Sequence, residues 1–221
     1  IPHGIPDVEF APTAPFKRDF GFDGRFVIST FGLLSRGKGL ETAIDAIARM
    51  ARRVPDVLYV ILGATHPVVA RDEGESYREE LRARIASHGI GHNVLMVDRY
   101  LTIGGLLHYL GASDAYVTPY VNPDQIVSGT LAYAVGAGKP VVSTPYLYAQ
   151  ELLAGDRGII VPFGDAAAMS EAFVALADDD SYRAAMARRA YDFARPMTWG
   201  NVGAVYSELL QSRLPSSAAA S

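Results

Sequence analysis

The first segment of the sequence whose residues could bind a ligand is a loop that combines two cations with three glycines. The loop reads Gly32-Leu33-Leu34-Ser35-Arg36-Gly37-Lys38-Gly39 and lies between a predicted strand and a predicted helix. Free N–H groups at the start of a helix attract anions, and the Arg36 and Lys38 side chains add positive charge to them. The pattern predicts an anion site; the simpler alternative is a glycine-rich turn with exposed charges.

The same loop matches most of a phosphate-binding P-loop, in which Gly-Lys is followed by a Ser or Thr whose hydroxyl binds magnesium. Here the following residue is Gly39. An acidic metal partner is nevertheless available, because Asp98 follows the apolar run Leu95-Met96-Val97. A P-loop-like NTPase therefore stays open as an alternative function.

A second loop carries hydroxyl groups. It runs from Asn122 to Thr130, contains Ser128-Gly129-Thr130, and leads into an Ala-rich segment with helical pattern. Two hydroxyls, an unhindered glycine backbone and a helix N-terminus suit a phosphate group or sugar hydroxyls. The alternative is that Ser128 or Thr130 only caps the helix.

The elements that must position these loops follow an alternating pattern. Apolar runs of strand length alternate with amphipathic segments, which favours parallel βαβ units in an α/β, doubly wound sheet. Ligands of such sheets lie beyond the carboxyl ends of the strands, so both loops are expected at one edge. The predicted strands are Phe26–Phe31, Val57–Leu62, Val94–Val97, Ala115–Thr118, Val141–Ser143 and Gly158–Val161. The predicted helices between them are Leu40–Arg53, Ser76–Ser87, Gly104–Leu110, Thr130–Gly136 and Leu147–Leu153.

The C-terminal third contains helical patterns and no strand-like run. Arg195-Pro196 predicts a break, because the residue before proline avoids the helical region. Residues 215–221 have nothing to bury and are expected to be disordered. The chain starts with Ile-Pro-His-Gly, so we expect a fragment of a longer protein. The predicted extra helices are Ala166–Leu176, Ser181–Ala194 and Val202–Leu210.

Composition excludes several classes of function. A net charge of −4 disfavours general nucleic-acid binding, and the chain has no cysteine for disulfides, thiolate nucleophiles or Cys-ligated metals. No apolar run approaches the roughly 20 residues of a transmembrane segment, so a cytoplasmic protein fits best. No metal site is expected: Asp178-Asp179-Asp180 reads as a helix cap, and glycines separate His88 from His92.

The order of three motifs resembles a known family. They are Ile1-Pro2-His3-Gly4-Ile5, the Phe31–Gly39 loop, and Ala137-Gly138-Lys139-Pro140-Val141-Val142. In this order they resemble the C-terminal, Rossmann-like donor-binding domain of GT-B retaining glycosyltransferases of the bacterial group 1 (family 4) class. The resemblance implies that residues 1–214 bind a nucleotide-sugar donor and that an N-terminal acceptor domain is absent from this chain.

The resemblance also implies roles for single residues in binding the donor phosphates and the base. The family neutralises the donor pyrophosphate with an Arg and a Lys, without metal or cofactor. Lys38 matches the family Lys, whereas the Arg position is Leu33, so Arg36 is expected to supply that charge. Arg99 and Tyr100 match the segment that contacts the nucleobase.

The family holds the donor sugar and ribose with two Glu residues, eight positions apart. Gln125 and Tyr133 occupy these positions here. Gln125 can hydrogen-bond to sugar hydroxyls but carries no charge, and Tyr133 can offer one hydrogen bond to the ribose. The resemblance implies leaving-group stabilisation by Lys38, Arg36 and the Ser128–Thr130 loop, with no protein nucleophile and no catalytic residue identified. A non-catalytic nucleotide-sugar-binding module is therefore a further alternative.

Overall fold

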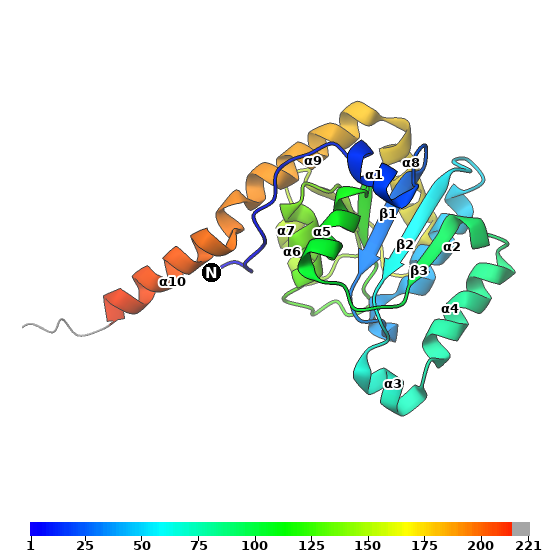
Figure 1. Cartoon of the computed structure of the whole chain (residues 1–221), viewed down its shortest axis with the longest axis horizontal. Helices are drawn as coiled ribbons and strands as arrows, with labels where there is room; N and C mark the ends of the chain where they lie inside the picture. The colour runs from blue at the N-terminus through cyan, green and yellow to red at the C-terminus, as the bar shows by residue number, and fades with distance from the viewer. Residues whose placement is uncertain (214–221) are drawn as a thin grey trace, which may run out of the picture.

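The structure is a computed structural model that describes residues 1–213. Its centre is a six-stranded sheet with the order β3-β2-β1-β4-β5-β6, in which all neighbouring strands pair in parallel (Figure 1). The predicted doubly wound α/β fold is confirmed, and only the last strand differs in its bounds, by one residue. The strands are β1 (Phe26–Phe31), β2 (Val57–Leu62), β3 (Val94–Val97), β4 (Ala115–Thr118), β5 (Val141–Ser143) and β6 (Gly158–Ile160).

Helices cover both faces of the sheet. Every residue of β2 is buried, as the apolar run Val-Leu-Tyr-Val-Ile-Leu requires. Tyr59 and Ile61 pack into the core formed with α2, α4 and α8, whereas Leu58, Val60 and Leu62 pack on the opposite face toward α1 and α5. The helices of this half are α1 (Ala14–Phe20), α2 (Leu40–Met50), α3 (Pro67–Glu73), α4 (Ser76–Ser87) and α5 (Ile103–Gly111).

The remaining helices follow β4, β5 and β6. A separate core cluster joins β4 and β5 to α6, α7 and α9. Asp179 accepts a hydrogen bond from the Tyr182 N–H at 2.8 Å, which confirms the interpretation of the aspartate run as a helix cap. The helices are α6 (Gly129–Gly136), α7 (Leu147–Leu153), α8 (Ala166–Asp178), α9 (Asp180–Ala194) and α10 (Trp199–Arg213), with short 3-10 turns η1 (Arg36–Lys38), η2 (Gly91–Asn93) and η3 (Arg195–Met197).

Two helices were absent from the prediction. Neither α1 nor α3 buries a residue completely, and both have proline in the first turn. Both are only seven residues long and, unlike the equally short α7, they bury no residue completely, so the sequence pattern did not reveal them. The predicted break at Arg195-Pro196 is confirmed, because η3 separates α9 from α10 there.

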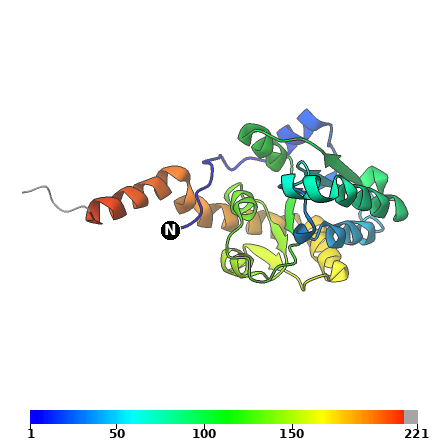
Figure 2. The same ribbon diagram turned by 90° about the horizontal axis from the view of Figure 1, so that it is seen from below.

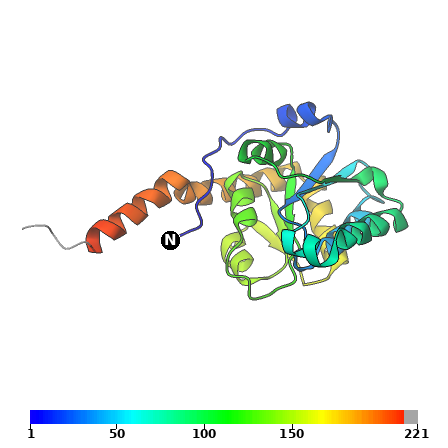
Figure 3. The ribbon, with the colours of Figure 1, turned by 60° about the horizontal axis from the view of Figure 1, so that its bottom comes forward.

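The end of the described chain leaves the body of the fold. Helix α10 projects away from the sheet, and the first residues of the chain run beside its start (Figures 1, 2 and 3). Ile5 donates to Met197 O and accepts from Trp199 N–H, both at 2.9 Å. These bonds join the first segment of the chain to the α9–α10 corner. The predicted disorder of residues 215–221 lies outside the described residues.

Candidate functional site

The two predicted loops meet at the carboxyl edge of the sheet. The strand order reverses between β1 and β4, which is where open α/β sheets form a crevice. The Val121 N–H bonds to Gly37 O at 3.2 Å, so the loop after β4 is tied to the loop after β1. Gly39 has φ +62°, and a Cβ there would lie 2.0 Å from the Pro119 carbonyl oxygen. Only glycine permits this approach of the two backbones.

Lys38 lies among three hydroxyl groups at this junction. Its Nζ donates to the Tyr120 hydroxyl at 2.9 Å and stands 4.1 Å from the centre of that ring. The Tyr120 hydroxyl lies 2.7 Å from Oγ1 of Thr130, which in turn lies 3.1 Å from Oγ of Ser128. We call Tyr120, Ser128 and Thr130 the hydroxyl cluster. It comes from the loop after β4 and from the first turn of α6.

Ser128 has the capping role that the sequence left open as the simpler alternative, and it also belongs to the hydroxyl cluster. As the N-cap of α6, its Oγ accepts from the Leu131 N–H at 3.2 Å, and the same atom belongs to the hydroxyl cluster. Gly129 follows it, and a Cβ at that position would lie 3.0 Å from Nε2 of His3. The site therefore combines one ammonium, three hydroxyls and a helix N-terminus, a set of donors suited to an anion.

Gly32 holds the end of β1 close to this group. Its φ of +133° is strained for other residues, and a Cβ there would lie 3.5 Å from Cγ2 of Thr130 and 3.8 Å from Nζ of Lys38. The absence of a side chain leaves the space over Lys38 open. Of the sequence-predicted phosphate ligands, the structure thus brings together Lys38, Ser128, Gly129 and Thr130.

Arg36 is not brought into this group. Its guanidinium bonds to both carboxylate oxygens of Glu80 at 2.7 Å and contacts Glu73 at 3.2 Å. Hydrogen bonds from Arg36 to these two carboxylates raise the pKa of its guanidinium, and its side chain is half exposed. In this arrangement Arg36 links η1 to α3 and α4, and the carboxylates of Glu73 and Glu80 already balance its positive charge.

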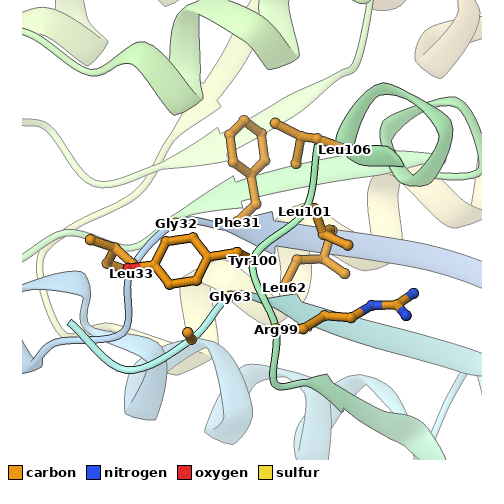
Figure 4. A pocket seen from close by; sticks show the side chains of 10 residues that line it. Phe31, Gly32, Leu33, Leu62, Gly63, Arg99, Tyr100, Leu101 and Leu106 are labelled. Carbon is orange, nitrogen blue, oxygen red and sulfur yellow. The ribbon is translucent and has the colours of Figure 1, made fainter. Parts of the chain in front are cut away.

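A pocket of about 180 Å³ lies beside the cluster, between the loops after β1, β2 and β3. Arg99 and Tyr100 line it, as expected for the segment after β3, and their side chains extend in opposite directions from the loop (Figure 4). Leu33, at the position of the family Arg, also lines it. Its other lining residues are apolar or glycine: Phe31, Gly32, Leu62, Gly63, Ala64, Leu101 and Leu106.

A buried arginine anchors the loop that carries Arg99 and Tyr100. Arg78 is 1% exposed and bonds to Asp98 at 2.7 Å, to Glu75 at 3.0 Å and to Gly63 O at 3.1 Å. It thereby joins α4 to the loops after β2 and β3. Asp98, the acidic partner that an NTPase would need, is the partner of this arginine instead.

Gln125 and Tyr133 have contacts elsewhere. The Gln125 amide donates to Val127 O at 3.0 Å within its own loop. The Tyr133 ring packs edge-on against His3 at 6.0 Å and Trp199 at 6.2 Å, and burial raises the pKa of its phenol. At the second Glu position, the chain has thus an aromatic contact with its own first segment and with α10.

Tyr120 is the site residue that sequence reasoning missed. It is 2% exposed and bonds to Lys38 across 82 positions of sequence. Its signal was weak: an aromatic residue two positions after a predicted strand, at the ligand edge of the sheet. Within residues 1–213, His, Asp and Glu side chains form no group of three that could hold a metal ion, and no helix is both long and apolar enough to cross a membrane.

Curated proteins with similar sequences include two kinds of glycosyltransferase. A phosphatidyl-myo-inositol mannosyltransferase of Mycolicibacterium smegmatis is 27% identical over 207 residues, covering 92% of this chain and 49% of that protein. A D-inositol 3-phosphate glycosyltransferase of Corynebacterium urealyticum is 29% identical over 187 residues, covering 84% of this chain and 43% of that protein. The chain therefore spans about half the length of the curated relatives it matches.

Solved structures share the fold at lower identity. Anabaena Alr3699/HepE, determined in complex with UDP, superposes with a TM-score of 0.79 at 22% identity and covers 90% of this chain and 52% of that one. The C-terminal domain of the glycosyl transferase group 1 family protein LpcC from Francisella tularensis has a TM-score of 0.74 at 20% identity. It covers 86% of this chain and 95% of that one.

The family model described as "Glycosyl transferases group 1" matches residues 25–179, from the start of β1 to the end of α8. This range contains both loops, the hydroxyl cluster and the Arg99–Tyr100 pocket. The expected resemblance is confirmed: this chain belongs to the group 1 glycosyltransferase family.

Proposed function

We propose that the chain is the donor-binding half of a retaining glycosyltransferase that uses a nucleotide-diphosphate sugar without a metal ion. The observation that carries this proposal is the meeting of Lys38 with the hydroxyl cluster at the N-terminus of α6. Family membership supports the reaction type, and UDP in the HepE structure supports a nucleoside diphosphate as ligand. The acceptor would bind to an N-terminal half that this chain does not contain.

In this proposal the donor lies across the carboxyl edge of the sheet. The diphosphate contacts Lys38, Ser128, Gly129 and Thr130, and the nucleobase enters the pocket lined by Arg99 and Tyr100. Gln125, in the loop just before Ser128, is the candidate partner for the sugar hydroxyls. The Tyr133 phenol, which is only half-buried, is the candidate for one hydrogen bond to the ribose.

The chemistry asked of these residues is stabilisation of a leaving group. When the bond between the anomeric carbon and the phosphate oxygen breaks, negative charge grows on the terminal phosphate, and Lys38 and the hydroxyl donors lower its energy. Removing one such donor typically costs about 2.7–4 kcal/mol in the transition state. Lys38→Ala in a full-length enzyme is expected to reduce turnover about 10²–10³-fold, as measured by sugar transfer, and the anomeric configuration of the product by NMR tests retention.

The binding test uses the chain itself. Calorimetric titration with UDP, GDP, ADP and ATP, with and without magnesium, should find one diphosphate that binds without metal. Lys38→Ala should lower that affinity at least tenfold, because a charge-assisted contact with phosphate is lost. Arg36→Ala is the matched control from the same loop. It should change the affinity less than about threefold, because its guanidinium already bonds to Glu73 and Glu80.

Other outcomes would favour other functions. Magnesium-dependent preference for ATP would support an NTPase, although Gly39 offers no hydroxyl and Asp98 is held by Arg78. A non-catalytic binding module is favoured by the absence of carboxylates at positions 125 and 133. Tight diphosphate binding with no transfer by the full-length protein would establish that second function, and equal binding by Lys38→Ala would contradict the proposed site.

A further inference from the structure

Tyr120 stands between the ammonium of Lys38 and the two hydroxyls that begin α6. We propose that Tyr120 is a positioning residue of the donor site, which holds the Lys38 ammonium over the site and, through the Thr130 hydroxyl, orients the Ser128 hydroxyl as a donor toward phosphate oxygens. This inference rests on the proposed function, because it assigns the site a phosphate ligand.

The direction of the hydrogen bonds follows from what each group can donate. An ammonium has three N–H donors and no acceptor, so in its bond to Lys38 the Tyr120 oxygen accepts. The single phenol hydrogen is then free for the short 2.7 Å contact with Oγ1 of Thr130. The charge of Lys38 favours this polarity, since a charged donor polarises the hydroxyl that accepts from it.

The same reasoning extends to Ser128. Having accepted from Tyr120, the Thr130 hydroxyl donates to Oγ of Ser128 at 3.1 Å. The Ser128 oxygen also accepts from the Leu131 N–H, so both of its lone pairs are used. Its hydrogen faces the Tyr120 oxygen at a long 3.5 Å, and an acceptor-rich ligand can take it from that weak contact. The Lys38 ammonium has Tyr120 as its one hydrogen-bond partner among residues 1–213, which leaves two ammonium N–H groups for a ligand. An acceptor-rich phosphate is the ligand that this set of donors fits.

Tyr120 is held firmly enough to do this. Its ring is 2% exposed and stacks on the Tyr146 ring at 5.2 Å and 20°. Its carbonyl oxygen accepts from Thr144 Oγ1 at 2.6 Å, and the Tyr146 hydroxyl bonds to Thr118 at 3.1 Å. The phenol oxygen is therefore preorganised before any ligand arrives, and the flexible Lys38 side chain loses less freedom when phosphate binds.

The test is Tyr120→Phe in the 221-residue chain. Calorimetry would compare pyrophosphate, the best bound of UDP, GDP and ADP, and the nucleoside of that diphosphate. Losing a hydrogen bond to a charged group corresponds to about a tenfold or greater loss of affinity, expected for pyrophosphate and the diphosphate but not for the nucleoside. Tyr59→Phe is the matched control: it removes a buried phenol oxygen in β2 that has no hydrogen-bond partner among residues 1–213, and it should leave all three affinities unchanged.

A double-mutant cycle separates positioning from a direct or merely structural role. If Tyr120 positions Lys38, adding Tyr120→Phe to Lys38→Ala should lower pyrophosphate affinity by a smaller factor than Tyr120→Phe does alone, because only the orientation of the Ser128 hydroxyl is still lost. Additive losses, or an equal loss of nucleoside binding, would overturn the inference. Should Tyr120→Phe fail to fold, Thr130→Val interrupts the same chain of hydroxyls and should weaken pyrophosphate binding severalfold; unchanged binding would overturn it too.

Failure of this inference differs from failure of the proposed function. If the unmodified chain binds neither pyrophosphate nor any diphosphate, the donor site itself is refuted, and Tyr120 loses its role with it. If the unmodified chain binds them, Lys38→Ala does not, and Tyr120→Phe binds as well as the unmodified chain, only the role of Tyr120 is refuted.

Discussion

Single residues decide how much charge the proposed donor site contains. Lys38 is the one described cation at the proposed diphosphate position, because Leu33 replaces the family Arg and Arg36 bonds to carboxylates 37 and 44 positions further along the chain. The sequence places Arg36 in the loop but does not predict that Glu73 of α3 and Glu80 of α4 contact it. A side chain of arginine length can turn to either side of its loop, and the partner that meets it decides which.

The buried Lys139 makes a prediction about pH. Burial lowers the pKa of Lys139 to about 8, against an ordinary value near 10.4. Between these two values the unfolded chain binds more protons than the folded one, so the contribution of Lys139 makes stability rise with pH. Relative to Lys139→Met, the wild-type chain should gain up to about 3 kcal/mol of unfolding free energy between pH 7 and 10.5.

Urea unfolding at a series of pH values measures this difference. Subtracting the variant cancels the other titrating groups, including the buried tyrosines. Curves for the two proteins that run parallel across the window would contradict a lowered pKa for Lys139.

At the scale of elements, the strands were predicted well because each is a short apolar run with its own boundaries. All six strands follow from local composition, and the order of the sheet brings the two loops to one edge. The helices α1 and α3 escaped prediction because they bury no residue completely and carry no periodic apolar face. A short helix with no completely buried residue thus leaves little local signal in the sequence.

Helix α8 offers a test of such a local signal. The Asp165 carboxylate accepts from the N–H groups of Ala167 at 3.0 Å and Ala168 at 2.9 Å, which caps the helix. Asp165→Ala should lower the free energy of unfolding by about 1 kcal/mol, measured by urea denaturation. Asp165→Asn should lose only a small part of this, because asparagine caps as well as aspartate. Equal losses in both variants would mean that the charge, rather than the cap, is what stabilises α8.

At the scale of the whole molecule, α10 stands apart from the body (Figure 1). After Val202, which is 8% exposed, the described side chains of α10 are exposed, Leu210 by 63%. By contrast the α9–α10 corner is well packed. Met197 is 4% exposed, and its carbonyl oxygen accepts a hydrogen bond from the Ile5 N–H. The corner therefore belongs to the stable domain, and most of α10 does not contribute to its core.

Truncation tests this division. A chain ending after Gly203 should lose less than about 1 kcal/mol of unfolding free energy in urea, because the described side chains that it removes are exposed. A chain ending after Ala194 lacks Met197 and the bonds to Ile5, and should lose several kcal/mol. A large loss in the longer truncated chain would show that α10 stabilises the domain through contacts beyond Val202.

The sequence by itself determined the α/β class, the strands, the ligand edge and the residues Lys38, Ser128, Gly129 and Thr130 as neighbours at that edge. These follow from short-range patterns and from the geometry of parallel sheets. Only the tertiary structure decided that Arg36 turns to Glu73 and Glu80, that Tyr133 packs on His3 and Trp199, and that Tyr120 bonds to Lys38. Each of these contacts depends on which element, distant in the sequence, packs beside the side chain. That neighbour is selected by the packing of the whole chain and not by the spacing of residues along it.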